Sequence, residues 1–539
     1  MDRSHPRVLV LFALVAAIGL WAHARSYAFF ADDAFITLRY GRMLWEHGEP
    51  VYNLGQRVEG YTSPLWMLGA ALAHAFVNPV PVMQGLGGLC GIVWLAGLAR
   101  LWWLLEPRSP GGGMLVVGAT ALSCPVAAWT MGGLETPLFG ALLTWSVAEA
   151  GYLASRPRGM RHALLVAALL SLTTLARPEG ALVTAVVVTA LFVLRLDRTK
   201  WREPVVVGAV YALCTGAHVL WRYLYYGYPF PNTYYLKSSG EAAELAGRGV
   251  AYVLLAAREL GWPLVVLIAL GVLVPVFRGS PEDNARLPTR RLILWTSKAL
   301  VLLFIPYVIR IGGDFLDLYR FFAPTLPLAF VLVAAGLQAA SHRVRVPWQA
   351  MLALGATLLA LHGYNQWHLR ARSLQVSEKA RIDHGLEALG WTKLYALRWA
   401  AMGRWVASMT EPDEWMAVGA AGAMPYFANI SNLDTFGLCD EFVAHHGSIV
   451  ASRPGHQRFA PFDYMVRRRP TFIFVSDFSR DQPMRSLSSL AHFRREGYQL
   501  VEAHITPEAH GAPEAFYHYL YVREDRAKQL EGRPHFRGR

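Results

Sequence analysis

The chain has 539 residues, of which 54% are hydrophobic and only 17% are charged, and its mean hydropathy is +0.28. A soluble protein carries charge on about a quarter of its residues, so this composition indicates a membrane protein and argues against the soluble enzyme classes. The net charge of +13 could suggest nucleic acid, but most of the excess cations lie in short loops between apolar runs, where they serve as topology signals. Four cysteines are too few for a disulfide framework in so long a chain.

A series of apolar runs predicts a polytopic α-helical membrane protein with about 11 transmembrane helices. The first run, Val8 to Ala24, follows Arg3 and Arg7 and lacks a small-residue cleavage site, so we expect a retained span with a cytoplasmic N-terminus. The other runs lie at 82–104, 113–131, 136–152, 162–176, 180–197, 204–222, 261–277, 292–310, 320–340 and 347–365.

Two apolar stretches do not fit a full crossing. Pro64 to Val77 has only about 14 residues, which predicts a re-entrant or interfacial helix. Glu241 to Leu260 includes Arg258 and Glu259 and has an amphipathic pattern, which predicts a helix that lies on the membrane surface. The parity of the span count depends on the first of these two assignments.

Lysine and arginine are concentrated in alternate loops, namely the loop with Arg108 and the loops at 156–161, 195–202, 278–291 and 343–345. All five fall on the same side as the N-terminus, so the positive-inside rule assigns them to the cytoplasm. With an odd number of spans, the chain from about residue 366 lies outside. We therefore expect a multi-pass protein of a bacterial cytoplasmic (inner) membrane with a periplasmic C-terminal domain.

The chain is expected to divide into a transmembrane domain, residues 1–365 with an outer loop at 25–81, and a soluble α/β domain, residues 366–539. The tail begins with an amphipathic helical stretch from Glu378 to Met409, and later apolar runs predict strands at 415–418, 472–475, 500–505 and 516–522. Residues 418–425 lack the spacing of a dinucleotide-binding loop and predict a strand-to-helix turn. The polar, basic end, residues 523–539, is expected to fray.

Two adjacent carboxylates, Asp32 and Asp33, follow the first span at the membrane boundary. Charges at this depth cost desolvation energy unless they pair with cations, bind a metal or take part in chemistry. Three interpretations stay open: the N-cap of a following helix, a general base with a second acid that orients it, or the ligands of a divalent cation. A divalent cation is the one cofactor that these residues suggest.

Further unusual polar residues fall in the predicted outer loops. Arg177 and Glu179 could form a purely structural ion pair, and the tyrosines at 223–235 are typical of an aromatic belt. Lys237 suits a phosphate with an apolar tail, and the forked guanidinium groups of Arg310 and Arg320 match phosphate oxygens. A histidine such as His456 is, by residue type alone, more often simply solvated. The candidate substrate-binding residues are Arg39, Glu59, Tyr61, Glu135, Arg177, Glu179, Asn232, Tyr235, Lys237, Arg310, Asp314, Arg320, His456 and Arg458.

Seven strings in these segments together resemble a bacterial branch of the polytopic GT-C glycosyltransferases, that of the terminal arabinofuranosyltransferases of the mycobacterial cell wall. The strings are DDAFITLRY (32–40), VYNLGQRVEGYTSPLW (51–66), GGLETPLFGAL (132–142), ARPEG (176–180), YYGYPFPNTYYLK (225–237), GGDFLDLYRFFAP (312–324) and PGHQR (454–458). The first string combined with EGYTSPLW is specific, whereas ARPEG alone is weak. The resemblance spans most of the chain.

This resemblance implies the GT-C fold and a transferase that moves a sugar from a polyprenyl-phosphate donor to a glycan, lipid or protein outside the cytoplasmic membrane, with inversion. It implies that an acid of the first outer loop is the general base, with Asp33 slightly favoured over Asp32. Arabinofuranose is the favoured sugar. The alternatives are mannosyl or aminoarabinosyl transfer on the same fold, and a flippase or transporter of lipid-linked sugars. Because the donor supplies the energy, no nucleotide is expected. No nucleic-acid partner is expected either, because the excess cations mark cytoplasmic loops.

Overall fold

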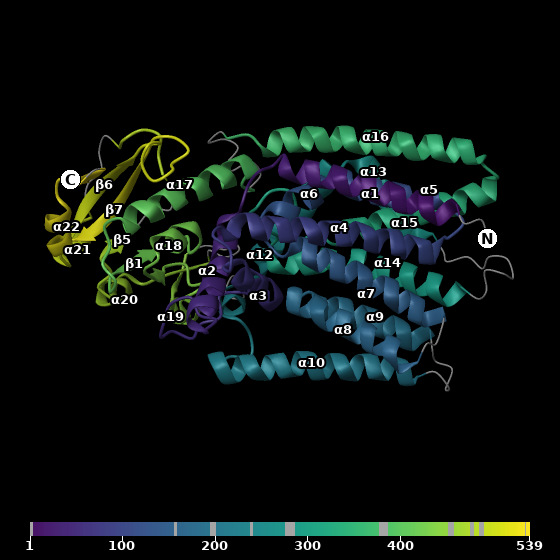
Figure 1. The fold of residues 1–539 in the computed structure, drawn as a ribbon, viewed down its shortest axis with the longest axis horizontal. Helices are drawn as coiled ribbons and strands as arrows, with labels where there is room; N and C mark the ends of the chain where they lie inside the picture. Colours follow the sequence, from purple (N-terminus) through teal and green to yellow (C-terminus); the bar gives the residue numbers. More distant parts are fainter. Residues whose placement is uncertain are drawn as a thin grey trace.

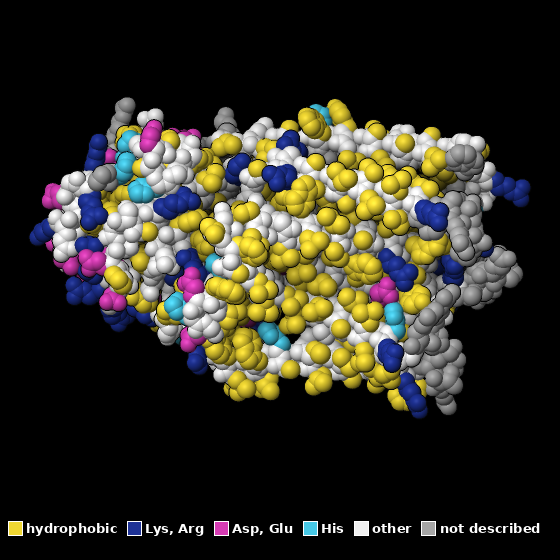
Figure 2. Space-filling model, in the orientation of Figure 1, with side chains coloured by type: hydrophobic (Ala, Val, Ile, Leu, Met, Phe, Trp, Pro, Cys, Tyr) yellow, Lys and Arg dark blue, Asp and Glu magenta, His cyan; other side chains and the backbone are white. Residues whose placement is uncertain are grey.

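The computed structural model of the chain describes residues 4–538 apart from 156–158, 195–200, 238–240, 275–285, 377–385, 451–456, 475–478, 485–489 and 534. A long helical bundle makes up most of the molecule, and a smaller domain with a β-sheet lies at one end of it, opposite the N-terminus (Figure 1). Hydrophobic side chains cover the visible side of the bundle in a broad band, whereas charged side chains gather over the small domain and at the far end (Figure 2).

The predicted apolar runs form the helices of the bundle. These are α1 (Ser4–Arg25), α4 (Pro79–Leu105), α5 (Pro110–Leu122), α6 (Cys124–Met131), α7 (Thr136–Ser155), α8 (Met160–Ala176), α9 (Gly180–Leu194), α10 (Arg202–Tyr226), α13 (Trp262–Leu273), α14 (Leu287–Ile311), α15 (Leu326–Val344) and α16 (Trp348–Ser373). Within the described residues, five helices are long and apolar enough to cross a membrane, or up to seven spans if each of two bent pairs is counted as one. This number is lower than the predicted 11.

Short, broken and less apolar helices account for the difference. α7 and α16 are long enough, with 20 and 26 residues, but are not among the helices apolar enough to cross. α8 has 17 residues, α9 has 15 and α13 has 12, fewer than the ~20 that span a bilayer. The run predicted at 113–131 is divided at Ser123 into α5 and α6, which are bent by 57°. Gln366 of α16 compensates for the break, because its Oε1 accepts a hydrogen bond from the backbone N–H of Cys124 at 2.8 Å. An amide without a partner would be costly at this depth.

Polar contacts connect several bundle helices at the end remote from the small domain (Figure 1). Arg290 of α14 pairs with Glu106, which follows α4. Ser109, which precedes α5, donates a hydrogen bond to Gln338 of α15 at 2.8 Å. The described parts of the arginine-rich loops therefore share one end of the bundle, as the alternation of charged loops predicts.

Four further helices come from the predicted outer segments: α2 (Asp32–His47), α3 (Pro64–Ala73), α11 (Asn232–Lys237) and α12 (Ala242–Leu260). α3 has 10 residues and is too short to cross, as predicted. α12 is amphipathic, as predicted, because its buried residues Leu245, Gly249, Tyr252 and Ala256 recur every three or four positions. It is bent by 104° relative to α13.

The C-terminal domain is an α/β domain, which confirms the predicted class. Its six-stranded sheet has the order β2-β1-β5-β7-β6-β8, in which β1 is parallel to β2 and β5, and the other neighbours are antiparallel. The strands are β1 (Trp415–Val418), β2 (Ser431–Asp434), β5 (Phe472–Ile473), β6 (Tyr498–Ile505), β7 (Phe516–Arg523) and β8 (Phe536–Gly538), and β3 (Ser448–Ile449) pairs separately with β4 (Arg458–Phe459). The helices are α17 (Leu389–Ala407), α18 (Ala423–Ala428), α19 (Glu441–His446), α20 (Phe462–Arg467), α21 (Ala491–Arg495) and α22 (Glu524–Leu530).

Several boundaries differ from the prediction. The end of the chain does not fray: it forms α22 and β8, and it buries Leu530 and Phe536. The predicted domain boundary at 365 falls inside α16, which continues to Ser373. The helix predicted from Glu378 begins at Leu389, and residues 378–385 of that prediction lie outside the described residues. The four predicted strands are present, and residues 419–422 form the predicted turn between β1 and α18.

Candidate active site

The acid pair opens helix α2, where carboxylates favour the positive end of the helix dipole. Neither acid is the N-cap, because the capping position is Ala31 and it has no side-chain cap bond. Asp32 reaches the C-terminal domain instead: its Oδ1 accepts a hydrogen bond from the backbone N–H of Ala423 at 2.8 Å. The adjacent Gly422 permits this contact, because a Cβ there would lie 2.1 Å from the backbone oxygen of Asp32. Asp32 therefore helps to hold the two domains together.

Asp33 lies in a different environment. Its side chain is partly exposed, and its carboxylate accepts no hydrogen bond within the described part of the chain. Burial among protein atoms raises the pKa of Asp33 above its ordinary value, while Arg320 and Lys237 favour the charged form and oppose this shift. A carboxylate with a raised pKa and no structural bond is suited to accept a proton from a substrate.

Arg320 lies in the loop after α14 and acts electrostatically on Asp33. Its Nε lies 2.9 Å from Asp314 Oδ2, and its guanidinium lies over the rings of Trp129 and Phe321, at 5.4 and 5.6 Å from their centroids. Asp314 is in turn held by the backbone N–H of Phe315, which donates to its Oδ1 at 2.9 Å. One edge of the guanidinium is thus fixed by Asp314, which orients the group.

Lys237 is the last residue of α11 and the second cation near Asp33. Its side chain is exposed to solvent, yet the surrounding protein lowers its pKa, and Arg320 lowers it further. Two cations held close together repel each other, so an anion between them would relieve the repulsion. Asp33, Lys237, Asp314 and Arg320 act on one another electrostatically, and we call these four residues the Asp33 cluster.

Arg177 joins two predicted acids at the ends of bundle helices. Its Nη2 and Nε donate to the two carboxylate oxygens of Glu179 at 2.7 and 3.2 Å, and its Nη1 lies 3.2 Å from Glu135 Oε1. Burial opposes the charge on Glu179, but Arg177 outweighs it and lowers the pKa of that carboxyl. Arg177 and Glu179 therefore form an ion pair, in agreement with the structural interpretation of these two residues rather than with substrate binding. Glu135 also affects Asp33, because its negative charge raises the pKa of the Asp33 carboxyl.

Arg39 has a structural role. It is 2% exposed, and its guanidinium donates to the backbone oxygens of Tyr52, Pro425 and Ile430 and to Asn53 Oδ1. Two of these acceptors belong to the C-terminal domain, so Arg39 fastens that domain to α2. The guanidinium nitrogens of Arg39 are thus bound within the protein, and the substrate-binding role predicted for this residue is replaced by a structural one.

Three other predicted residues lie at the seam between the domains. Glu59 Oε2 accepts a hydrogen bond from Arg222 at 2.6 Å, while Oε1 is buried without a hydrogen-bond partner. The amide nitrogen of Asn232 donates to the backbone oxygens of residues 437, 438 and 440. The hydroxyl of Tyr61 lies 3.0 Å from that of Tyr226. Asn232 and Tyr61 thus build the seam, and only Glu59 keeps an unused polar atom.

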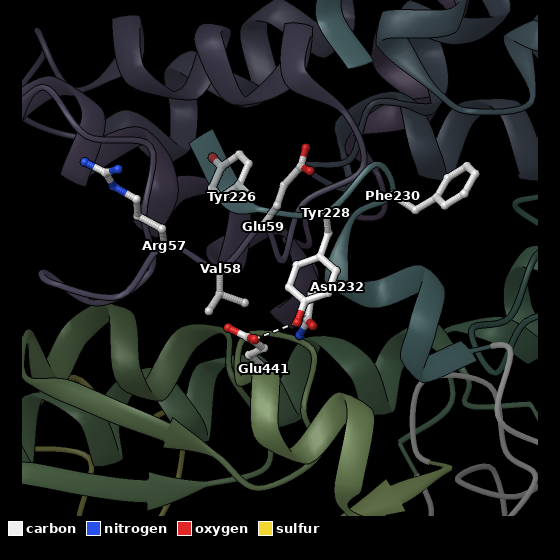
Figure 3. Close-up of a pocket in the computed structure, with 8 residues that line it drawn as sticks. All are labelled: Arg57, Val58, Glu59, Tyr226, Tyr228, Phe230, Asn232 and Glu441. Atoms are coloured by element: carbon white, nitrogen blue, oxygen red, sulfur yellow. Dashed lines mark hydrogen bonds between the residues drawn. The ribbon is translucent and has the colours of Figure 1, made fainter. Parts of the chain in front are cut away.

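The seam contains a small recess that is open to the outside. We call it the seam recess; it is lined by Arg57, Val58, Glu59, Tyr226, Tyr228, Phe230, Asn232 and Glu441 (Figure 3). In Figure 3 the hydroxyl of Tyr228 points toward Glu441, and it donates to Glu441 Oε1 at 2.8 Å. Sequence reasoning missed Glu441, because nothing local in the chain links it to residues more than 200 positions earlier.

The remaining predicted residues are dispersed. Arg310 is exposed in the last turn of α14. The ring of Tyr235 lies 4.7 Å from that of His445, and Arg458 donates to the backbone oxygen of Gly447 at 2.8 Å. His456 lies outside the described residues. Among the residues that the structure describes, no group of three or more His, Cys, Asp or Glu could hold a metal ion, so the divalent cation stays a prediction.

A helical membrane bundle with outer helices and an α/β domain at one end defines the fold as that of the GT-C membrane glycosyltransferases, which confirms the predicted fold class. ArnT from Cupriavidus metallidurans in the apo state is similar with a TM-score of 0.52 at 11% sequence identity, over 96% of this chain and 98% of that chain. A structure of ArnT from the same organism bound to undecaprenyl phosphate gives a TM-score of 0.48 over 79% of this chain and 85% of that chain, at 12% identity.

In sequence, the chain is similar to two proteins named terminal beta-(1->2)-arabinofuranosyltransferase. It is 29% identical to the Mycobacterium tuberculosis protein over 266 residues, 47% of this chain and 42% of the relative. It is 29% identical to the Corynebacterium glutamicum protein over 385 residues, 64% of this chain and 53% of the relative. The chain thus spans about half the length of the curated relatives it matches. Residues 390–522 match a family described as "Domain of unknown function (DUF8728)".

Proposed function

We propose that this protein is a membrane glycosyltransferase that moves a sugar from a polyprenyl-phosphate donor to an acceptor hydroxyl, with Asp33 as the general base. The observation that carries the proposal is the Asp33 carboxylate: it is partly exposed, free of hydrogen bonds within the described chain, and within the field of Lys237 and Arg320. The GT-C fold and the two relatives named arabinofuranosyltransferase support the same class of reaction and favour arabinofuranose as the sugar.

The proposed step exchanges one bond for another. The acceptor oxygen attacks the anomeric carbon from the face opposite the phosphate, and the bond from that carbon to the phosphate oxygen breaks. The acceptor proton passes to the Asp33 carboxylate, and the configuration at the anomeric carbon is inverted. A positioned base of this kind contributes about 10²- to 10⁴-fold to a rate. Neither a nucleotide nor a covalent enzyme intermediate is needed.

The two cations have a matching task. The polyprenyl phosphate leaves with one more negative charge than it had as part of the donor, so groups that attract this charge lower the barrier. Lys237 offers a compact ammonium, and Arg320 offers the guanidinium edge that Asp314 does not occupy. Because the polyprenyl tail dissolves in the bilayer, a phosphate held at one end of the bundle would keep its tail beside the apolar band.

The charge distribution also bears on how the protein is oriented in the membrane. The described arginine-rich ends of the bundle lie opposite the C-terminal domain (Figure 1), and cytoplasmic loops carry an excess of arginine and lysine. We therefore propose an inner-membrane protein whose C-terminal domain and Asp33 cluster face the periplasm. The acceptor would be a glycan, lipid or protein of that compartment.

The test is transfer by the purified protein in proteoliposomes, with synthetic polyprenyl-phosphate arabinofuranose as donor and an arabinofuranosyl oligosaccharide as acceptor. Asp33→Asn should lower kcat by about 10²- to 10⁴-fold with no loss of thermal stability. Asp32→Asn is the matched control: it should chiefly lower thermal stability, because Asp32 holds Ala423. Full activity in Asp33→Asn would overturn the assignment of the base. Movement of the donor across the bilayer without transfer would instead favour a flippase.

A further inference from the structure

The turn that precedes Arg320 has a strained backbone. Leu318 and Tyr319 are consecutive non-glycine residues in the left-handed region, with φ of +57° and +46°. Residues with a Cβ rarely adopt this conformation, because the Cβ crowds the following carbonyl oxygen. Both residues are completely buried. Backbone of this kind persists only where the surrounding contacts hold it in place, and it is concentrated at functional sites.

Asp317 and Arg372 hold the turn from one side. Asp317 Oδ1 accepts a hydrogen bond from the backbone N–H of Leu318 at 2.7 Å and another from Arg372 Nη2, also at 2.7 Å. Asp317 is 2% exposed, and a carboxylate so deeply buried needs an opposite charge within the protein. Arg372 of α16 supplies this charge, and it also pairs with Glu259 of α12. The ion pair therefore ties the turn to two helices.

Backbone contacts hold the same turn from other directions. The backbone N–H of Glu387 donates to the oxygen of Phe315 at 2.7 Å, and that of Asp317 donates to the oxygen of Glu387 at 3.1 Å. The indole Nε1 of Trp129, in α6, donates to the backbone oxygen of Leu318 at 3.3 Å. The strained turn is thus held by α6, by α16 and by the segment that leads into α17.

The turn determines where Arg320 lies, because Arg320 directly follows Tyr319. The guanidinium of Arg320 lies over the ring of Trp129, 5.4 Å from its centroid, and the same side chain holds the oxygen of Leu318. A relaxed turn would therefore move Arg320 relative to Trp129. A displacement of about 1 Å at a reacting group can lower a rate by about 100-fold.

We propose that Asp317 and Arg372 are positioning residues: their ion pair maintains the strained Leu318–Tyr319 turn and thereby fixes the guanidinium of Arg320 for the leaving phosphate. This inference rests on the proposed transfer function, in which Arg320 attracts the charge of that phosphate. A purely structural ion pair would affect the protein to the same extent whether Arg320 is present or not. A positioning pair acts only through Arg320.

A double-mutant cycle on the rate of transfer distinguishes the two roles. Arg372→Met should lower kcat by about tenfold when Arg320 is present. In the Arg320→Met background the same change should lower the remaining kcat by less than about twofold, because the group to be positioned is gone. Arg372→Lys keeps a charge for Asp317 and should retain more activity than Arg372→Met. Equal fold losses in the two backgrounds would overturn the proposal.

Glu259→Gln is the matched control for this cycle. It removes the other carboxylate partner of Arg372 and keeps the pair with Asp317. The kcat of this variant should stay within about twofold of the wild-type value. A loss as large as that in Arg372→Met would overturn the assignment to the Asp317 pair.

Fluorine NMR of the full-length protein in micelles tests the turn without any donor. The tryptophans are labelled as fluorotryptophan, and the Trp129 signal is assigned by its absence in Trp129→Phe. Asp317→Asn and Arg372→Met should shift the Trp129 signal, and Glu259→Gln should not. An unchanged Trp129 signal in Asp317→Asn and Arg372→Met would overturn the proposal, whether or not the protein transfers a sugar. Shifted signals in a protein whose wild type transfers from no polyprenyl-phosphate donor would overturn the proposed function and support the positioning of Arg320.

Discussion

Glu59 makes the stability of the seam depend on pH. Its side chain is 2% exposed, and burial raises its pKa from 4.5 to about 7, although Arg222 favours the charged form. A carboxyl whose pKa is raised in the folded state stabilises the fold fully below its unfolded pKa. This contribution is lost as the pH rises from 4.5 to about 7. A shift of this size corresponds to about 3 kcal/mol of unfolding free energy.

The assay compares the wild type with Glu59→Gln, which removes this titration and keeps the shape. Unfolding free energy is measured in detergent micelles between pH 4 and pH 8, and the difference between the two proteins cancels all other titrating groups. The unfolding free energy of the wild type should fall by about 3 kcal/mol relative to that of the variant as the pH rises to 7. Above pH 7 the difference should stay constant. A flat difference would refute the reasoning. A wild type that gained stability over this range would show that the Arg222 ion pair outweighs burial.

Three other changes test the contacts between the domains and the end of the chain. Gly422→Ala would place a Cβ 2.1 Å from the backbone oxygen of Asp32. The rate of transfer should therefore fall by more than about tenfold, and thermal stability should fall with it. An unchanged transfer rate would contradict the contact between Asp32 and residues 422–423. Arg39→Met leaves four oxygens without their donor and should cost about 3 kcal/mol, read as earlier unfolding and faster proteolysis between the domains. Deletion of residues 524–539 removes α22 and β8 and should lower the melting temperature, whereas a frayed tail would leave it unchanged.

The grouping of Asp33, Lys237, Asp314 and Arg320 was predictable because membrane topology is a strong constraint. Once alternate loops are assigned to the cytoplasm by their arginines, the other loops must meet on the opposite face. Residues far apart in the chain were thereby brought to one end of the bundle without any knowledge of packing. The separate roles of Asp32 and Asp33 were not predictable, because they depend on the contact with Ala423, almost 400 residues later.

Other features depend on tertiary packing that local patterns do not report. Hydropathy reads 113–131 as one span, because the break at Ser123 is compensated by Gln366 from a distant helix. The end of the chain looks polar and frayed, yet three residues of β8 pair with β6 and bury Phe536. The tyrosines at 223–235 resemble an aromatic belt, and only the folded chain brings Tyr228 to Glu441.

The most direct test of the account is the fate of a single lipid-linked sugar. Wild-type protein in proteoliposomes is given polyprenyl-phosphate arabinofuranose of known anomeric configuration and an oligosaccharide acceptor, and the products are analysed by mass spectrometry and NMR. The account predicts free polyprenyl phosphate, an acceptor extended by one sugar with inverted configuration, and loss of both products in Asp33→Asn. Retained configuration, or equal product in Asp33→Asn, would contradict it.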